Sequence, residues 1–228
     1  MNSQQRAAGM PQWLARWVLF FEWEIQNSLQ QFSASLAPFS RVLDAGAGEC
    51  QHKSHFSGHR YFAVDLAIGD ANWNYGKLNA VADLAALPLA AATFDAAIHI
   101  VTLEHVPEPK LVLQEISRCL RPGAPILVVV PHEWEVHQHP HDYFRYTCFG
   151  MRYLLEQAGF TSIEVRPSGG YFRLLARRLL NSLPFFAWPW KALVFLIVSP
   201  VAMMLPMLEP LDKNKDFTLG YICTARKL

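Results

Sequence analysis

The chain alternates short apolar runs with longer segments in which apolar residues recur every three or four positions. The apolar runs occupy residues 41–44, 61–65, 96–101 and 126–130, and each is followed by a polar or helical segment. Runs that are apolar without strict alternation suit strands that helices cover on both faces. The pattern therefore predicts an α/β fold with a doubly wound, mostly parallel sheet.

Two segments after the second strand have helical periodicity. Residues 109–120 are closed by Arg-Pro-Gly, and residues 151–158 are followed by Gly159, a common helix stop. In residues 109–120, the positions expected to face inward are Leu111, Val112, Ile116 and Leu120. Both segments are predicted to be helices that cover the sheet.

A further helix is predicted from Pro11 to about residue 36, with the proline in its first turn. Its aromatic residues cover more than one face: Trp13, Trp17, Phe20, Phe21 and Trp23. This helix either packs as a lid over the domain or touches a membrane interface. We therefore divide the chain into an N-terminal helical extension, residues 1–36, and a domain of residues 37–228.

Length, charge and cysteine content limit the class of protein. The 228 residues allow one well-buried domain with an elaboration. A net charge of +1 gives no global field toward nucleic acid, so no nucleic-acid partner is expected. The four cysteines are scattered, which indicates neither disulfides nor a zinc site and favours a cytoplasmic location. Charged residues interrupt the apolar N-terminal segment, which argues against a signal peptide.

The late chain contains two more strand-like segments, residues 162–166 and 217–225. If they pair, the second is a final antiparallel strand, and residues 168–216 form an insertion between neighbouring strands. From residue 185 to 208 the only charge is Lys191. The uninterrupted part, residues 192–208, would rise about 26 Å, against a hydrocarbon core of roughly 30 Å. Pro200 and Pro206 interrupt this part as a helix. If residues 217–225 pair with the sheet, the chain must return to the side of the membrane that it left, which excludes a single crossing.

The insertion is therefore expected to form an interfacial helical hairpin. A helix over residues 171–180 would present Arg173, Arg177 and Arg178 to anionic head groups. The aromatic residues that resemble an interface belt are Phe185, Phe186, Trp188 and Trp190. We expect peripheral contact with the inner membrane face through residues 171–210; a lid or a dimer interface is the alternative, and the oligomeric state stays open.

The first strand ends in a glycine turn, RVLDAGAGEC over residues 41–50. Gly46 and Gly48 can adopt positive φ angles, so the backbone can turn sharply and approach a ligand closely. Asp65 ends the next strand, where a carboxylate can accept hydrogen bonds from both hydroxyls of a ribose. This pair of strands predicts a nucleotide-type binding edge.

Further motifs follow in a specific order: Ala82-Asp83-Leu84, Leu87-Pro88, Thr93-Phe94-Asp95, Leu103-Glu104-His105-Val106 and Leu120-Arg121-Pro122-Gly123. With the glycine turn and Asp65, they resemble class I S-adenosylmethionine-dependent methyltransferases of the type 11-like group over about residues 39–165. The resemblance implies a Rossmann-like fold and S-adenosylmethionine as cofactor. Cys50 stands where many members have a third glycine, and the helix that follows it is expected to be short.

The resemblance also implies the residues that hold the cofactor: Asp44, Ala45, Gly46, Ala47, Gly48, Asp65, Leu66, Asp83, Leu84 and Thr102. The glycine turn would lie along the methionine and the ribose, and Asp65 would hold the ribose hydroxyls. Asp83 and Leu84 would border the adenine, although Asp83 could instead cap a turn. Thr102 and Leu103 would close the pocket near the sulfonium.

The loop over residues 131–147 concentrates four histidines and Asp142 within eleven residues. His137, His139 and His141 alternate, but Pro140 interrupts any strand there and no second ligand cluster is evident, so no metal site is expected. The loop resembles an HxxPxDYxRxT pattern of a methyltransferase subgroup.

His105 and His137 titrate near neutral pH and are candidates for a general base. Asp142 and Tyr143 would orient them, and Arg145 would contact an anion or phosphate. In the alternative interpretation, His105 caps a helix, and Asp142 and Arg145 form a structural ion pair.

Together these features predict methyl transfer from S-adenosylmethionine to an amphipathic or membrane-associated small molecule, with O-methylation slightly favoured. The alternative is a non-catalytic binding protein that keeps the fold as an interaction module. The short helix after Cys50 is its best support.

Overall fold

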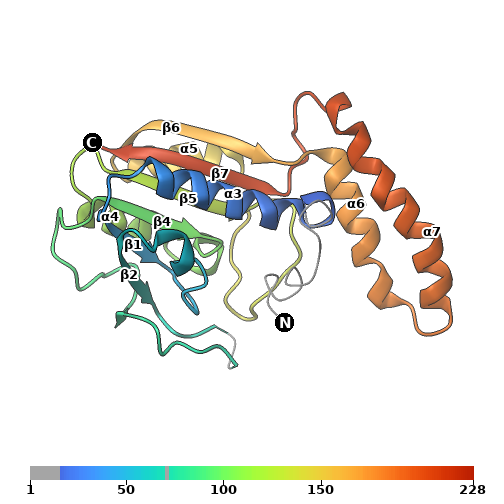
Figure 1. The fold of residues 1–228 in the computed structure, drawn as a ribbon, viewed down its shortest axis with the longest axis horizontal. Helices are drawn as coiled ribbons and strands as arrows, with labels where there is room; N and C mark the ends of the chain where they lie inside the picture. Colours follow the sequence, from blue (N-terminus) through green and yellow to red (C-terminus); the bar gives the residue numbers. More distant parts are fainter. Residues whose placement is uncertain (1–15, 70–71) are drawn as a thin grey trace. The chain divides into compact units, whose positions relative to one another are not determined.

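A seven-stranded sheet organises the protein in a computed structural model that describes residues 16–69 and 72–228 (Figure 1). The strand order is β3-β2-β1-β4-β5-β7-β6. The strands are β1 (Arg41–Ala45), β2 (Arg60–Asp65), β3 (Ala80–Val81), β4 (Ala96–Ile100), β5 (Pro125–Pro131), β6 (Phe160–Ser168) and β7 (Gly220–Lys227). The six predicted strands are confirmed, with ends that move by a few residues. The two-residue β3 was missed because it has no apolar run.

The first five strands pair in parallel, outward from β1 in both directions. β1 pairs with β2 on one side and with β4 on the other, and β3 and β5 extend the two halves. The order therefore reverses between β1 and β4. In open α/β sheets, ligands bind beyond the carboxyl ends of the strands at such a switch point.

The last strand, β7, runs antiparallel to its neighbours. Its end lies beside the start of β5, because the Gly123 N–H donates to the Lys227 carbonyl at 3.0 Å. The Leu228 N–H donates to the Gly159 carbonyl, just before β6, and the Leu219 N–H donates to the Ser168 carbonyl at the end of β6. The predicted Rossmann-like, mostly parallel sheet with a final antiparallel strand is thus confirmed.

Helix α4 (Pro109–Cys119) and helix α5 (Cys148–Gln157) follow the predicted segments. Leu111 was wrongly expected to face inward: it is 46% exposed, and Leu113 is fully buried instead. The helix α5 begins earlier than predicted because the Thr147 hydroxyl caps it, accepting from the Gly150 N–H at 3.1 Å. Two 3-10 turns, η1 (Lys53–Phe56) and η2 (Leu103–His105), follow β1 and β4.

Helix α3 (Phe20–Ser35) corresponds to the later part of the predicted N-terminal helix; Pro11 and Trp13 lie outside the described residues. Its buried apolar residues form one stripe at helical spacing: Phe21, Ile25, Leu29 and Phe32. Leu29 is completely buried, so this stripe is core, as the packing interpretation requires. Of the aromatic residues named above, Phe21 belongs to this stripe, whereas Trp17, Phe20 and Trp23 are half-buried.

Contacts between residues divide the chain into two compact units, and the division falls within α3 after Gln26. One unit holds residues 27–166 and Tyr221–Leu228, which include most of the sheet. The other holds the described residues up to Gln26 together with Pro167–Gly220. The boundary predicted from the sequence lay at residue 36.

The second unit contains the predicted helical insertion: α6 (Tyr171–Asn181), η3 (Leu183–Phe185), α7 (Trp190–Met204) and η4 (Leu205–Leu211). Helices α6 and α7 lie side by side and run in opposite directions (Figure 1). The Asp212 carboxylate accepts from the Tyr171 N–H at 2.7 Å at the start of α6. Gly170 permits this, because a Cβ there would lie 2.3 Å from an Asp212 oxygen.

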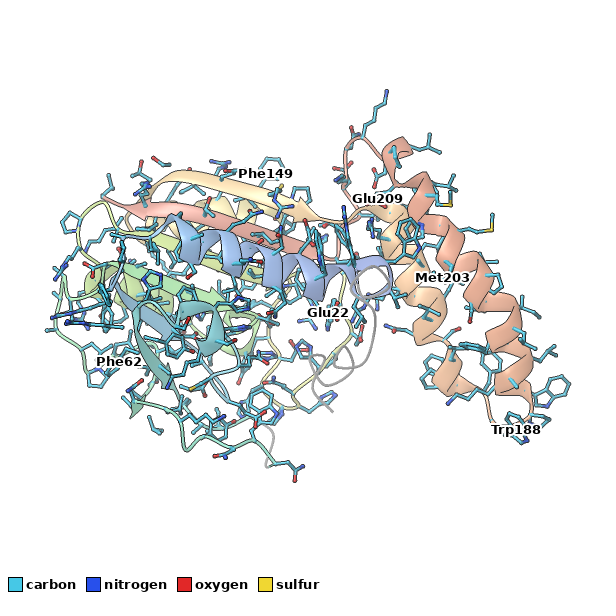
Figure 2. The ribbon with its side chains drawn as sticks, in the orientation of Figure 1. Glu22, Phe62, Phe149, Trp188, Met203 and Glu209 are labelled. Carbon is cyan, nitrogen blue, oxygen red and sulfur yellow. The ribbon has the colours of Figure 1, made fainter. Side chains whose placement is uncertain are left out.

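Two arginines of α6 have partners within the protein. The Arg177 guanidinium donates to both Glu22 carboxylate oxygens, at 3.0 and 3.2 Å. The Arg173 guanidinium lies 3.7 Å from the centre of the Phe20 ring. They tie α6 to the N-terminal helical segment within this unit; that these two arginines and Arg178 face lipid head groups stays a prediction. Figure 2 shows Glu22 at the N-terminal end of α3.

The unpaired nitrogen of a core histidine leads to a prediction about stability. His99 in β4 is fully buried, and its Nδ1 donates to the Ala45 carbonyl at 2.6 Å, while Nε2 has no partner among the described residues. Burial lowers the pKa of His99 from 6.5 to about 4. The unfolded chain therefore binds a proton below pH 6.5 that the folded chain refuses until about pH 4, so stability is lost as the pH falls through this window.

We expect His99→Asn, whose amide can keep the donation to Ala45, to remove this dependence. Between pH 7.5 and pH 5, the wild type should lose about 2 kcal/mol of unfolding free energy relative to the variant. Urea unfolding at both pH values measures the difference. Parallel pH dependence in the two proteins would show that His99 does not stay neutral.

Candidate active site

The glycine turn lies at the carboxyl end of β1, beside the switch point. Gly46 and Gly48 have φ angles of +84° and +51°, in the left-handed region that glycine adopts without strain. The N–H groups of Gly46 and Ala47 donate to the Val64 carbonyl in β2, at 2.8 and 3.1 Å. The turn is therefore fastened to the neighbouring strand.

Asp65 completes this fastening. One of its oxygens accepts from the Gly48 N–H at 2.9 Å, and the other accepts from the Ala67 N–H at 2.8 Å. Each carboxylate oxygen can accept more than one hydrogen bond, so both keep acceptor capacity for a ligand. The half-buried carboxylate is held at the end of β2, next to the turn, as the sequence predicted.

The turn passes between two side chains, one of which leaves no room for a Cβ at Gly46. A Cβ on Gly46 would lie 2.4 to 2.8 Å from Thr102 side-chain atoms. A Cβ on Gly48 would lie 3.4 Å from the Trp73 ring. Thr102 was predicted at this site. Trp73 was not, because it sits in a polar loop without a motif.

Asp44 is more buried than its predicted role suggested. It has no exposed surface, and one oxygen accepts from the Tyr61 hydroxyl. Burial raises the pKa of Asp44 to about 7, although the Tyr61 hydroxyl opposes this. The other oxygen has no partner among the described residues. In this conformation the carboxylate faces the protein interior.

The remaining predicted cofactor residues differ in how far they are exposed to solvent. Ala45, Ala47 and Leu84 are buried, as is Leu103, whereas Leu66 is 42% exposed. Asp83 is exposed, and its carboxylate accepts from the Ala85 N–H at 2.8 Å, which is the turn-capping role given as the alternative.

Cys50 adopts a backbone conformation that glycine favours. Its φ angle is +60°, in the left-handed region, and its side chain is buried. The helix after it is short, as predicted: it is the 3-10 turn η1, of four residues. The departure from the family pattern therefore lies in the side chain, while the backbone has a conformation that glycine also adopts.

A second group of polar side chains lies in η2 and the loop after β5. Glu104 is fully buried, and its Oε1 lies 3.6 Å from His105 Nε2 and 3.9 Å from His137 Nε2. The two imidazole rings meet edge to face, with centroids 4.7 Å apart. Burial raises the pKa of Glu104 to about 8 and lowers the pKa of His105. The candidate bases are thus brought together, around a carboxylate that sequence reasoning did not single out.

Asp142 and Arg145 form the structural ion pair given as the alternative. The Arg145 guanidinium donates to both Asp142 oxygens, at 2.6 and 2.8 Å. Its remaining N–H groups donate to backbone carbonyls of Trp134, Glu135 and Phe144. Its donors are all used within the loop in this structure, and the role of Arg145 as an anion contact stays a prediction. The hydrogen bonds from Arg145 hold the pKa of Asp142 well below its usual range.

Asp142 contacts one candidate base, whereas Tyr143 contacts another histidine of the loop. The Asp142 Oδ2 accepts from the backbone N–H of His137 at 2.8 Å and lies 3.5 Å from His137 Nδ1. The Tyr143 hydroxyl lies 3.3 Å from His141 Nδ1, and its side chain is largely exposed. His139 and His141 lie outside the group that contains His137.

Comparison with known proteins agrees with this geometry. Residues 43–128 match the protein family described as "Methyltransferase domain". This range includes Gly46, Gly48, Asp65, Asp83, Glu104 and His105, but not His137. No curated protein matches the chain.

Solved structures with the same fold share little sequence with it. A methyltransferase dependent on S-adenosylmethionine from Archaeoglobus fulgidus is 16% identical, with a TM-score of 0.59 over 89% of this chain and 93% of that one. A Burkholderia thailandensis 1,6-didemethyltoxoflavin-N1-methyltransferase is 18% identical, with a TM-score of 0.56 over 100% and 91%. The [4+2]-cyclase SpnF is 20% identical, with a TM-score of 0.55 over 90% and 80%. At such identities the likeness establishes the fold alone.

The family match over residues 43–128, together with the motifs and the sheet order, supports a class I S-adenosylmethionine-dependent methyltransferase of the type 11-like group. The residues present fit this cofactor. Gly46 and Gly48 leave the backbone of the turn uncovered by a Cβ, and Asp65 keeps acceptor capacity beside it.

The close approach of Gly46 to Thr102 can be tested by substitution. Gly46→Ala should lower the unfolding free energy by at least about 2 kcal/mol, because the new Cβ overlaps Thr102 and the φ angle is unfavourable. Gly58→Ala is the matched control, since nothing lies within 4 Å of a Cβ there, and its effect should stay within about 0.5 kcal/mol. Urea unfolding measures both, and equal effects of the two substitutions would contradict the packing.

Proposed function

We propose that this methyltransferase transfers the methyl group of S-adenosylmethionine to a small amphipathic or membrane-associated acceptor, and that a hydroxyl oxygen is the favoured nucleophile. The observation that carries the methyl-donor part is the Gly48 to Asp65 hydrogen bond within the matched family region. When bound, the cofactor supplies a methyl group on a positively charged sulfur. The task of the protein is then to align a nucleophile with that methyl group and to exclude water.

The turn and its neighbours would bind the cofactor. Asp65 would accept hydrogen bonds from the ribose hydroxyls with the acceptor capacity that Gly48 and Ala67 leave free. Leu84 would supply an apolar surface for the adenine, and the Trp73 ring lies close enough to Gly48 to cover the same side of the turn. Thr102 would limit the space at Gly46.

The histidines near Glu104 support oxygen as the methylated atom. His137 Nδ1 lies 3.1 Å from the Glu135 carbonyl, so it carries the proton and Nε2 keeps a lone pair. His105 Nδ1 is fixed in the same way by the His141 carbonyl, at 2.5 Å. Either Nε2 could accept the proton of an acceptor hydroxyl, and His137 is the more exposed of the two, at 26% against 10% of the side chain.

The insertion supports an acceptor that is held at a membrane. Phe185 and Trp188 are 87% and 81% exposed, and Trp188 lies at the tip of the α6 and α7 pair (Figure 2). Among the described residues, the 22-residue helical stretch Trp190–Leu211 is long and apolar enough to cross a membrane by length and composition, and only 11% of its most apolar window is buried. The chain returns to the sheet at β7, so we propose that this stretch lies in one membrane face, on the cytoplasmic side.

Binding of S-adenosylhomocysteine tests the cofactor site. The wild type should bind it, and Asp65→Ala should weaken binding at least about 100-fold, because two hydrogen bonds to a charged acceptor are lost. Asp216→Ala, an exposed aspartate outside the matched region, should bind as the wild type does. Isothermal calorimetry measures all three, with circular dichroism to confirm folding.

Two outcomes would count against this assignment. Undiminished binding by Asp65→Ala would remove Asp65 from the site. No binding by the folded wild type would favour the non-catalytic alternative, in which the fold serves only as an interaction module.

Flotation with anionic liposomes tests the membrane contact. The wild type should float with the vesicles, and the double variant Phe185→Ser, Trp188→Ser should remain at the bottom, because both exposed aromatic side chains are lost. Phe149→Ser is the matched control: Phe149 is 80% exposed on α5, outside the insertion, and this variant should float (Figure 2). Flotation of the double variant, or sedimentation of the wild type, would favour a lid or an interface between subunits.

A further inference from the structure

The Glu104 side chain is a buried carboxylate without a hydrogen-bond donor. It has no exposed surface, and neither oxygen has a hydrogen-bond partner among the described residues. Its backbone is well fixed, since its carbonyl accepts from the Tyr143 N–H at 2.8 Å and from the Phe144 N–H at 3.3 Å. A carboxylate in such surroundings is costly unless a positive charge compensates it.

The two groups nearest to this carboxylate also present lone pairs to it. A carbonyl oxygen only accepts hydrogen bonds, so the contacts of His105 Nδ1 with the His141 carbonyl and of His137 Nδ1 with the Glu135 carbonyl place the protons on Nδ1. Each Nε2 then points an unshared electron pair toward Glu104. His105 Nε2 is buried and has no hydrogen-bond partner in the described part of the chain.

The spacing of the three groups suits a single bound cation. Their ligand atoms all lie within 4.8 Å of one another, with 3.6 and 3.9 Å between Glu104 Oε1 and the two Nε2 atoms. A metal ion about 2.0–2.2 Å from each ligand requires separations of this order. The hydrogen bonds from Nδ1 to carbonyls are also the outer contacts that metal-binding histidines usually make.

We propose that Glu104, His105 and His137 bind one divalent first-row transition-metal ion such as Zn²⁺. Two imidazoles and one carboxylate favour such an ion over Mg²⁺ or Ca²⁺, which prefer oxygen ligands throughout. Three protein ligands leave at least one coordination position open, which water or an oxygen of the acceptor can occupy. The expectation of no metal site rested on Pro140 within the loop and on the lack of a second ligand cluster in the sequence, and this proposal departs from it.

The proposal does not rest on the cofactor site, but it competes with the general base proposed above, because a bound metal would occupy the same Nε2 lone pairs. The other way to compensate Glu104 is a proton on its own carboxyl group, and in that case the Nε2 lone pairs stay available for the general base. Metal titration separates the two possibilities, because it has a readout that needs neither cofactor nor acceptor.

The test uses the full chain, stripped with a chelator and titrated with Zn²⁺ by calorimetry and with Co²⁺ by visible absorption. We expect one equivalent to bind, with Co²⁺ bands of nitrogen and oxygen ligands. Glu104→Gln and His137→Asn should each weaken binding at least about tenfold. His139→Asn, an exposed histidine two residues from His137, should bind as the wild type does.

Two variants keep the test valid if one of them fails to fold, since His137 lies in a partly exposed loop and Glu104 in the core. No stoichiometric binding by the wild type, or equal affinity in the folded variants and the wild type, would overturn the proposal and leave the protonated carboxyl group. Binding of S-adenosylhomocysteine by Glu104→Gln shows separately whether the cofactor site is intact.

Discussion

The hydrogen bond from the Gly48 N–H to the Asp65 carboxylate joins the turn after β1 to the end of β2. It can form because the two strands are parallel and in a register that pairs Ala45 with Val64, so that they end at the same edge of the sheet. On the other side, Thr102 after β4 fills the space that a Cβ of Gly46 would need. Three strand ends are thus held around one turn, and several of the residues that the family resemblance assigns to the cofactor, namely Gly46, Ala47, Gly48, Asp65 and Thr102, lie on or beside it.

The pairing of β7 has a comparable effect on the insertion. The chain leaves the sheet at Ser168 and returns at Gly220, and the Thr218 hydroxyl donates to the Ser168 carbonyl at 2.9 Å across this gap. Because the insertion begins and ends at one place, its length and apolar character place no strain on the order of the strands. The insertion contacts the N-terminal segment of the same unit, for example through the 2.7 Å hydrogen bond from the Trp17 indole to the Met203 carbonyl.

Most of the fold was predictable because its signals are local. Apolar runs marked six strands, and the helix stops at Gly159 and Arg121-Pro122-Gly123 were read correctly. The sequence is less informative about side chains whose partners are distant along the chain. Glu22, 155 positions from Arg177, could not be recognised as its partner. Only a closer look at the LEH motif could have suggested Glu104, since the burial that makes it unusual is a property of the folded chain.

The sequence by itself determined the sheet, the glycine turn, Asp65 and the class of methyl donor, because each depends on residue types at short, regular spacings. The tertiary structure decided how the polar side chains are used. It placed Asp142 and Arg145 in an ion pair with each other, turned Asp44 toward Tyr61, and brought His137 to Glu104 and His105 from 33 positions away. The physical reason is that the hydrogen bonds and ion pairs of a polar side chain depend on its burial and on its partners. Both are set only when distant segments pack together.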